Sequence, residues 1–283
     1  MKKLLALFFV AVMTMCMVTA CGSKEQTSEM TEESAQTDAA GETTQEGSDA
    51  ADAIDDVLAD GVLTVGTNAE FPPFEYVGDD GEPDGFDVAL IKAIGEKLGV
   101  SVEVENMEFD SLVSSIGSKI DVAIAGMTVT DERKASVDFS DSYYEAVQYV
   151  IVPADSEIAT AEDLVGKTIG VQLGTTGDFI ASDDIADTTV NQYNKGVDAV
   201  NDLINGRVDC VIIDKNPAQV FASKFEGQLV ALDGAQFEFG VEEYAIALPK
   251  GNTDLAEKVN TALEEIKADG TFDELVKTYI EGE

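Results

Sequence analysis

Short apolar runs alternate, beyond residue 54, with segments whose apolar residues recur every three or four positions. Runs of four to eight apolar residues favour buried strands, and the longer period favours amphipathic helices. The predicted strands are Leu63–Gly66, Val102–Val104, Val122–Ala125, Val147–Val152, Thr168–Val171, Val190–Tyr193, Val208–Ile213 and Glu243–Leu248. The predicted helices are Asp87–Leu98, a segment from Phe109 through Ile116, Ala161–Leu164, a segment from Thr176, Val197–Ile204, a segment ending at Lys224, Leu255–Ala268 and Phe272–Tyr279. Strands that alternate with helices predict an α/β fold with mostly parallel sheets, and because the pattern restarts after Pro153 we expect two successive α/β units.

The first twenty residues have the features of a signal peptide. Lys2 and Lys3 precede an apolar stretch, Leu4–Val18, that is too short to span a bilayer comfortably. The stretch leads into Val-Thr-Ala-Cys, residues 18–21, which resembles the lipobox of bacterial lipoproteins. We therefore expect residues 1–20 to be removed and Cys21 to be lipidated; a plain signal peptide with a chance cysteine is the alternative.

The segment after Cys21 is rich in Ser, Thr, Gln, Ala, Gly and Glu and has no aromatic residue through Ala51. Such a segment buries too little apolar surface to offset the entropy lost on ordering. We expect residues 21–53 to form a lipidated, disordered and acidic tether. This arrangement would anchor the protein by lipid to the extracytoplasmic face of the cell membrane.

Composition excludes several classes of function. The formal net charge is −39, which argues against nucleic acid as a partner because phosphates would repel the chain. Cys16 leaves with the leader, Cys21 is the lipid site and Cys210 lies in an apolar strand, so no pair remains for a disulfide. The chain has no His, and no calcium-loop spacing is present. We expect no metal and no cofactor.

The stretch from Val122 to Arg133 is the first candidate binding segment. An apolar strand breaks into Gly126, Met127 and Thr128, which leaves carbonyls, amides and a hydroxyl at its carboxyl end, where open α/β sheets bind small ligands. Arg133 follows and can hold a carboxylate with two parallel hydrogen bonds. Acceptors for an ammonium beside a fork for a carboxylate suggest a free amino acid. An ordinary turn with a solvated Arg133 is the alternative.

Two other strand ends carry polar groups with more than one interpretation. The turn at residues 172–177, Gln-Leu-Gly-Thr-Thr-Gly, combines backbone amides with two hydroxyls and would favour an anion, although Thr175 or Thr176 could simply cap the next helix. Asp214 follows five apolar residues and is either a helix cap or a ligand group. Phe71 follows the first strand after a short loop, where it could belong to the core or line a cleft.

Several segments, taken in chain order, resemble the extracellular solute-binding proteins of polar amino acid ABC importers, the glutamine-, histidine- and arginine-binding type. They are GVLTVGTNAEFPPFEY (Gly61–Tyr76), GFDVALIKAIGEKLG (Gly85–Gly99), DVAIAGMTVTDERKASVDFSDSYY (Asp121–Tyr144), GKTIGVQLGTTG (Gly166–Gly177) and VDCVIID (Val208–Asp214). The resemblance extends from about residue 54 to the C-terminus.

The resemblance implies a fold of the type II periplasmic-binding-protein kind, with two α/β lobes, a two-strand hinge and a ligand in the cleft between the lobes. It places the hinge near Val147–Val152 and Glu243–Leu248. Lobe 1 would comprise residues 54–149 and 243–283, and lobe 2 residues 150–242. The implied function is capture of a polar L-amino acid by hinge closure and its delivery to an ABC permease with its ATPase; we expect a monomer.

The resemblance also implies roles for individual residues. The ligand carboxylate is assigned to Arg133 and to backbone amides of two turns: Gly126, Met127 and Thr128 in the first, and Thr175 and Thr176 in the second, which also contains Gly174. The ligand ammonium is assigned to the Ala125 carbonyl, the Thr128 hydroxyl and Asp214. Phe71 and Phe109 would sandwich the side chain, and Asn68, Glu70 and Gln172 are candidates for contacting its tip. Asn68 favours a neutral polar side chain such as glutamine, Glu70 keeps a cationic one possible, and glutamate fits least well beside Glu70 and Asp214.

Two other functions remain open. An enzyme of the same fold, such as a dehydratase acting on a cyclohexadienyl acid, could use carboxylates for acid–base chemistry, although the chain shows no nucleophile–base pair. A ligand-sensing module would normally add a membrane helix and an intracellular effector, and the chain ends shortly after Tyr279. A lipid tether without an effector favours transport.

Overall fold

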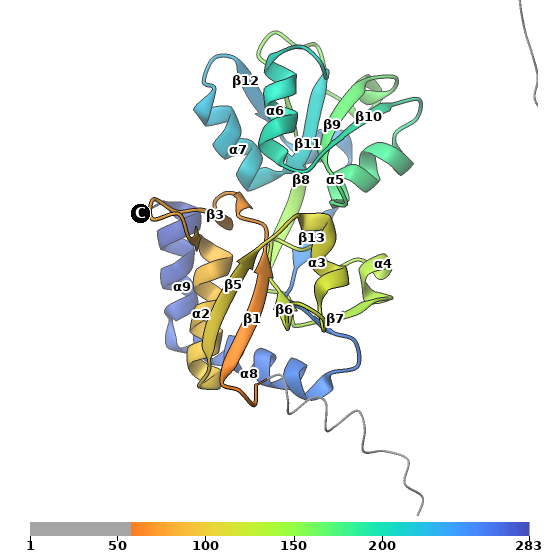
Figure 1. Cartoon of the computed structure of the whole chain (residues 1–283). Coiled ribbons are helices and arrows are strands. Elements are labelled where there is room, and N and C mark those ends of the chain that lie inside the picture. The colour runs from red at the N-terminus through yellow and green to blue at the C-terminus, as the bar shows by residue number, and fades with distance from the viewer. Residues whose placement is uncertain (1–57, 283) are drawn as a thin grey trace, which may run out of the picture. The chain divides into compact units, whose positions relative to one another are not determined.

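The computed structural model describes residues 58–282, all within one compact unit of the chain (Figure 1). The expected signal peptide, the lipid site at Cys21 and the tether to residue 53 lie outside the described residues. Within residues 58–282, no helix is both long enough and apolar enough to cross a membrane.

One mixed sheet forms the first lobe, with strand order β5-β1-β6-β14-β7. Its strands are β1 (Val62–Thr67), β5 (Ser101–Asn106), β6 (Val122–Ala123), β7 (Val137–Phe139) and β14 (Ala247–Pro249). Strand β1 is parallel to β5 and β6, while β14 is antiparallel to β6 and β7. Because Thr67 pairs with Asn106 and Gly66 with Ala123, the three parallel strands end at the same edge.

Helices cover both faces of this sheet. The elements are α2 (Phe86–Leu98), α3 (Phe109–Ser115), α4 (Asp131–Lys134), α8 (Thr253–Asp269), α9 (Thr271–Leu275) and its continuation η4 (Val276–Glu281). Buried residues of α2 and α8 pack with Leu63 and Val65 of β1, whereas Leu112 of α3 packs with Ala123 and Ala247 in a separate cluster. A small sheet of β2 (Glu70–Phe71), β3 (Glu75–Val77) and β4 (Pro83–Asp84) follows β1.

The second lobe contains a sheet of order β10-β9-β11-β8-β12. Its elements are β8 (Tyr144–Pro153), η1 (Ala161–Leu164), β9 (Thr168–Gln172), α5 (Thr176–Phe179), η2 (Ile180–Asp184), β10 (Thr189–Tyr193), α6 (Gly196–Ile204), β11 (Cys210–Asp214), α7 (Lys215–Lys224), β12 (Leu229–Leu232) and η3 (Gly234–Phe237). Val211 and Ile213 pack with α6 and α7 on one face of the sheet. Cys210 and Ile212 belong to a second cluster, with Leu164 of η1 and Phe237 of η3. The central strands β8, β9 and β11 are therefore buried on both faces, which explains their nearly continuous apolar sequence.

A two-stranded ribbon joins the lobes (Figure 1). Strand β13 (Val241–Tyr244) pairs antiparallel with the start of β8, from Val241 opposite Val147 to Tyr244 opposite Tyr144. Residues 148–151 already pair with β11 in the second sheet, so the ribbon lies earlier in the chain than the predicted crossing at Val147–Val152. We call residues 144–147 and 241–244 the hinge ribbon.

Some strand predictions were wrong in extent. The run Val122–Ala125 is strand only at Val122–Ala123, because the next residues leave the sheet to line the cleft. The predicted strand Glu243–Leu248 is two strands, β13 and β14, interrupted at residues 245–246 where the chain passes from the hinge ribbon into the first sheet. The strands β7 and β12 were not predicted, since each is short and lies at one end of its sheet.

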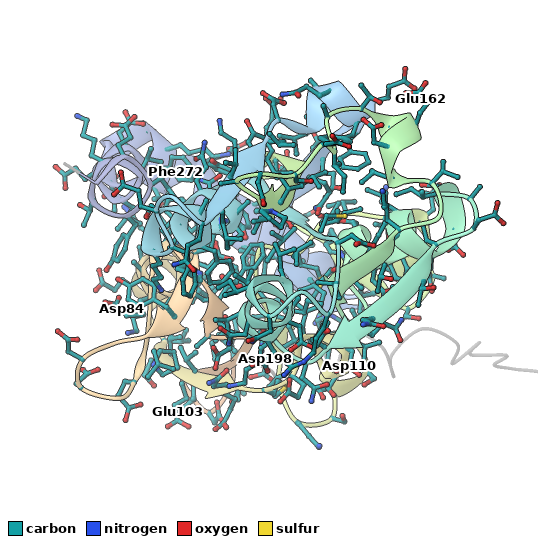
Figure 2. The ribbon with its side chains drawn as sticks, turned by 90° about the horizontal axis from the view of Figure 1, so that it is seen from above. Asp84, Glu103, Asp110, Glu162, Asp198 and Phe272 are labelled. Carbon is teal, nitrogen blue, oxygen red and sulfur yellow. The ribbon has the colours of Figure 1, made fainter. Side chains whose placement is uncertain are left out.

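The excess of acidic residues is carried at the surface. Glu103, Asp110, Glu162 and Asp198 are all exposed, and Figure 2 shows such side chains over both lobes. Their carboxylates remain hydrated and cost the fold little. The buried carboxylates of the described residues are few: Glu75, Asp87, Asp178 and Asp214.

Candidate functional site

A pocket between the lobes lies at the carboxyl ends of the parallel strands. The space in it that is free of protein atoms is about 290 Å³ with open solvent included, and a water-sized sphere has only about 10 Å³ in which to move. Its lining residues are Asn68, Phe71, Phe109, Ala125, Gly126, Thr128, Arg133, Gln172, Thr175, Thr176 and Asp214. All of them belong to the set predicted from the sequence. Three other predicted residues, Glu70, Met127 and Gly174, lie outside the lining.

Strand ends explain why residues so far apart in sequence meet here. Asn68 follows β1, Phe109 follows β5 by three residues, and the Ala125–Thr128 loop follows β6. In the second lobe, Gln172 ends β9 and Asp214 ends β11. Each sheet thus presents the carboxyl ends of its parallel strands to the cleft, where α/β proteins place small ligands.

Arg133 is a buried cation without an ionic partner. Its side chain is only 7% exposed, and no carboxylate within residues 58–282 lies close enough to form an ion pair with it. Instead Nη1 donates to the Thr128 carbonyl at 2.6 Å and Nη2 to the Gly174 carbonyl of the other lobe at 3.0 Å. Burial lowers its pKa to about 10, so it remains charged at neutral pH. Buried charges are normally paired, so this guanidinium is a candidate site for an anionic group of a ligand.

Two backbone amides join Arg133 as donors. Within the described chain, the amides of Thr128 and Thr176 donate to no protein acceptor. The predicted Gly126 amide is committed elsewhere, since it donates to Asp87 Oδ2 at 2.7 Å. The Thr175 amide points to the Gln172 carbonyl at 3.4 Å. Met127, whose amide was also predicted, does not line the pocket. Among the lining residues the anion donors are therefore Arg133, Thr128 and Thr176, fewer than the sequence predicted.

Gly126 needs to be glycine for a geometric reason. Its φ is +52°, and a Cβ there would lie 2.8 Å from the ring of Phe71 and 3.4 Å from that of Tyr244. Both a left-handed backbone and a close approach to aromatic rings exclude larger residues. Behind it, Asp87 accepts from the Gly126 amide and from the Tyr143 hydroxyl, at 2.7 Å and 2.8 Å. Asp87 therefore fixes the loop that carries Thr128.

Asp214 is a buried carboxylate that caps no helix. It stands at the start of α7, but its side chain accepts none of that helix's amides; it receives the Tyr244 hydroxyl through a short hydrogen bond. Burial and then the negative charge of Glu242 raise its pKa to about 7, against the lowering effect of Tyr244. No Lys or Arg within residues 58–282 forms an ion pair with it. The interpretation as a ligand group is therefore favoured over the helix cap.

The threonines of the cleft differ in what their hydroxyls do. Thr175 caps α5, accepting from the Asp178 amide, and donates to the Gln172 carbonyl. The hydroxyls of Thr128 and Thr176 instead both donate to Glu242 Oε2, at 2.6 Å and 2.9 Å. The sequence left open whether Thr175 or Thr176 was the cap, and the structure assigns that role to Thr175.

Two aromatic rings flank the pocket. Phe71 is 7% exposed and packs against Phe74, with ring centroids 6.0 Å apart. Phe109 lies beneath the guanidinium of Arg133, whose Cζ is 5.2 Å from the ring centroid. Such a contact fixes the plane of the guanidinium.

Amides form the remaining wall. Gln172 Nε2 donates to Asn68 Oδ1 across the lobes at 2.8 Å, and Asn68 Nδ2 donates to the Met107 carbonyl at 2.8 Å. Glu70 lies outside the lining and forms an ion pair with Lys195 of the second lobe, 2.5 Å away. Met127 is completely buried in the core of the first lobe.

Four residues that contact the site were not predicted: Gln148, Lys195, Glu242 and Tyr244. Gln148 gave a usable signal, since it is a lone polar residue in the apolar run VQYVIV and proves fully buried. Glu242 and Tyr244 alternate on one strand and so share a face of the hinge ribbon. Nothing local to Lys195 indicates that it pairs with Glu70, 125 residues away.

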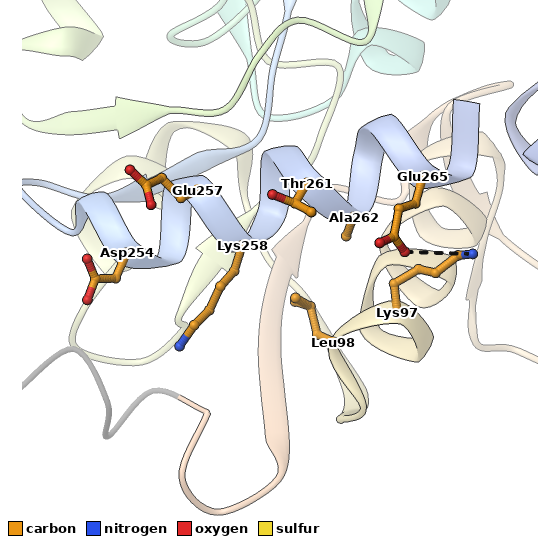
Figure 3. Close-up of a pocket in the computed structure, with 8 residues that line it drawn as sticks. All are labelled: Lys97, Leu98, Asp254, Glu257, Lys258, Thr261, Ala262 and Glu265. Atoms are coloured by element: carbon orange, nitrogen blue, oxygen red, sulfur yellow. Dashed lines mark ion pairs between the residues drawn. The ribbon is translucent and has the colours of Figure 1, made fainter. Parts of the chain in front are cut away.

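A second hollow lies on the surface of the first lobe, between the end of α2 and α8 (Figure 3). One of its charged groups, Lys97, is already paired, since its Nζ lies 2.7 Å from Asp269 and 4.0 Å from Glu265. None of the predicted site residues lines it. Over residues 58–282, no cluster of three or more acidic, His or Cys side chains has a geometry that could hold a metal ion.

We expect ligand affinity to depend on the protonation of Asp214. An ammonium group requires the carboxylate form, whereas burial raises the pKa of Asp214 to about 7. Binding should therefore release a proton, and affinity for an amino acid should fall by up to about tenfold per pH unit below 7 and level off above it. Arg133, with a pKa of about 10, stays charged throughout this range.

Titration calorimetry from pH 5 to 8.5, in buffers of different ionisation enthalpy, measures both quantities. Asp214→Asn is the control and should remove the dependence. A smaller slope below pH 6 is expected from Asp87, whose burial raises its pKa to about 6; a slope near pH 7 that persists in Asp214→Asn would contradict the assignment. Affinity that rises toward acid pH would contradict the assignment.

Comparison with known proteins was informative. Residues 63–282 match the bacterial extracellular solute-binding proteins, family 3. The L-cystine-binding protein TcyJ of Escherichia coli (strain K12) is 35% identical over 222 residues, covering 77% of this chain and 82% of TcyJ. The structure of a mutant of ArgBP from T. maritima has 43% identity and a TM-score of 0.74, covering 81% of this chain and 99% of that one. An ancestral arginine-binding protein bound to glutamine has 43% identity and a TM-score of 0.73, covering 77% and 97%.

Proposed function

Because this chain belongs to the bacterial extracellular solute-binding proteins, family 3, and serves as a substrate-binding protein for polar amino acids, we propose how its cleft holds that ligand. The carboxylate binds Arg133 and the amides of Thr128 and Thr176. The ammonium binds Asp214, the Ala125 carbonyl and the Thr128 hydroxyl. Phe71 and Phe109 enclose the side chain.

One observation carries this proposal. The pocket contains a buried guanidinium and a buried carboxylate, and neither has an ionic partner within the described residues. An unpaired buried charge costs several kcal/mol, so the pair is costly unless a ligand supplies both opposite charges. An α-amino acid carries a carboxylate and an ammonium on one carbon and satisfies both.

The side-chain end of the pocket supports a neutral polar ligand. Asn68 and Gln172 provide amides there, and the charge of Glu70, which could attract a cation, is balanced by Lys195. We therefore propose glutamine, with a cationic amino acid as the second candidate because relatives are named for arginine as well as for cystine. A glutamate side chain would meet no free cation at this end.

Closure of two lobes about the hinge ribbon explains capture. Arg133 and Thr128 come from the first lobe, and Gly174, Thr176 and Asp214 from the second, so a ligand that touches both favours the closed arrangement. We propose that residues 58–143 with 245–282 move as one body and residues 148–240 as the other, because residues 148–151 already pair with β11 and the hinge ribbon lies between the two bodies. A permease and its ATPase would receive the ligand from the closed monomer. Lipid on Cys21 and the tether would hold the protein at the extracytoplasmic face of the cell membrane.

Binding, rather than turnover, is supported by the relatives, which are named as binding proteins. The chain has no His, and the charged groups of the pocket are the two that a zwitterion needs. A dehydratase would have to convert a cyclohexadienyl acid, and incubation with that substrate is the direct check.

A thermal-unfolding screen of the refolded, ligand-stripped protein against the twenty standard amino acids tests the proposal. A ligand present at 100 times its Kd should add ~2.7 kcal/mol to the free energy of unfolding. Glutamine should give the largest shift, followed by arginine, lysine and histidine. If no free amino acid raises the melting temperature, the proposed function is wrong; if only cationic ones do, the side-chain assignment is wrong and the zwitterion site stands.

A further inference from the structure

Glu242 of the hinge ribbon has no role in the ligand contacts proposed above, yet it is hydrogen-bonded to two residues of the pocket. Its Oε2 accepts hydrogen bonds from the Thr128 hydroxyl at 2.6 Å and from the Thr176 hydroxyl at 2.9 Å. Gln148 Nε2 lies 3.4 Å from the same oxygen and donates to the Thr176 hydroxyl at 3.0 Å. One oxygen on the connection between the lobes thus binds a threonine from each lobe.

These two threonines are the ones whose backbone amides are free to bind an anion. Thr128 follows β6 in the first lobe, and Thr176 begins α5 in the second. Fixing both side chains on one acceptor fixes the distance between the two amides. Glu242 is absent from the pocket lining, so it acts on the ligand through the threonines.

The direction of these hydrogen bonds also matters. A carboxylate oxygen has no proton to give, so each threonine hydroxyl must donate to Glu242. The Thr176 hydroxyl then donates a hydrogen bond to Glu242 and accepts one from Gln148, so only the Thr176 backbone amide remains available to the ligand. Because the hydrogen of the Thr128 hydroxyl is used on Glu242, only the lone pairs of its oxygen are available in the pocket. Such an oxygen can accept from an ammonium but cannot donate to a carboxylate.

We infer that Glu242 is a positioning residue for amino acid recognition: it aligns the Thr128 and Thr176 amides from opposite lobes and makes the Thr128 hydroxyl an acceptor for the ligand ammonium. The inference rests on the proposed function and adds a residue that determines selectivity for amines. Its charge also acts on the pocket, because it raises the pKa of Asp214 and stabilises the charged form of Arg133.

Other charged groups surround Glu242, and their charges also affect how ligand affinity varies with pH. Toward the ligand pocket they are Arg133, Asp214 and Tyr244, and around the hollow behind the hinge ribbon they are Lys134, Glu145, Asp184 and Glu243. Glu243 follows Glu242 on the strand, is exposed and lies opposite Glu145. It supplies a matched control, since its removal changes the same charge on the same strand.

Two variants separate the positioning effect from the charge effect. Glu242→Ala removes the acceptor and should weaken binding of the amino acid about ten- to a hundredfold, as expected for hydrogen bonds to a charged group. The deaminated analogue, which lacks the ammonium, should lose less. Glu242→Gln keeps an acceptor oxygen of the same reach and should restore most of the affinity, while the midpoint of the pH dependence moves to lower pH because Asp214 loses a neighbouring charge.

Titration calorimetry with both ligands, from pH 5 to 8.5, measures these effects, and Glu243→Ala should leave them unchanged. In a Thr128→Val background the loss caused by Glu242→Ala should shrink, because the two residues act through one contact. Unchanged affinity in Glu242→Ala, or an equal loss for the amino acid and its deaminated analogue, overturns the inference. Failure of the unaltered protein to bind any amino acid would instead overturn the proposed function.

Discussion

Arg133→Ala is expected to weaken amino acid binding by about 2–5 kcal/mol, because the ligand carboxylate would then be buried without its cation. The structure adds a second contribution to this loss. Arg133 Nη2 donates to the Gly174 carbonyl of the other lobe, so the variant also loses a contact that joins the lobes. Both effects lower affinity, and calorimetry with the amino acid identified by screening measures their sum.

Two further variants define what Arg133 supplies. Arg133→Lys keeps the charge but loses the planar fork and its stacking on Phe109, so it should recover only part of the affinity. Lys134→Ala changes the neighbouring exposed cation, whose ion pair with Asp131 spans 3.8 Å at the surface, and should have no effect. Affinity within a factor of two in Arg133→Ala would remove this residue from the site.

Asp214→Asn is expected to cost an amino acid on the order of 2–5 kcal/mol and its deaminated analogue far less. The asparagine retains the shape of the carboxyl group and can still accept from the Tyr244 hydroxyl, so the hinge contact survives. It lacks the negative charge that the ammonium needs. The deaminated analogue loses little, because it has no ammonium to pair with Asp214 and no longer buries its carboxylate near that charge.

Paired titrations of the amino acid and its analogue, above pH 8 where Asp214 is ionised, give this difference directly. Asp198→Asn removes an exposed carboxylate of α6 that does not line the pocket, and controls for the effect of lowering the net negative charge of the protein. Equal losses for the two ligands in Asp214→Asn would show that this residue supports the fold of the cleft rather than the ammonium.

Local patterns predicted most of the elements correctly. Leu63–Gly66 lies within β1, Asp87–Leu98 within α2 and Thr168–Val171 within β9. Such elements follow from burial periodicity and turn residues, which are properties of neighbouring positions. The restart of the pattern after Pro153 predicted two α/β units, and the resemblance to a family added the hinge and the return of the chain to the first lobe, which spacing alone could not indicate.

Hydrogen-bond partners distant in sequence decided the rest. Gly126 was expected to offer its amide to the ligand, but Asp87, 39 residues away, accepts it. Glu70 was expected at the ligand side chain, but Lys195 pairs with it from the other lobe. In each case the residue was the predicted one, and folding determined whether its polar group remained free.

The sequence by itself determined which strand ends carry polar side chains, and therefore where the cleft residues come from, because strand and turn signals are encoded in adjacent positions. Only the tertiary structure decided which donors and acceptors in the cleft remain available and that Glu242 binds Thr128, 114 residues away. The physical reason is that a buried polar group bonds to whichever partners the packed chain places beside it, and those partners are set by the arrangement of both sheets.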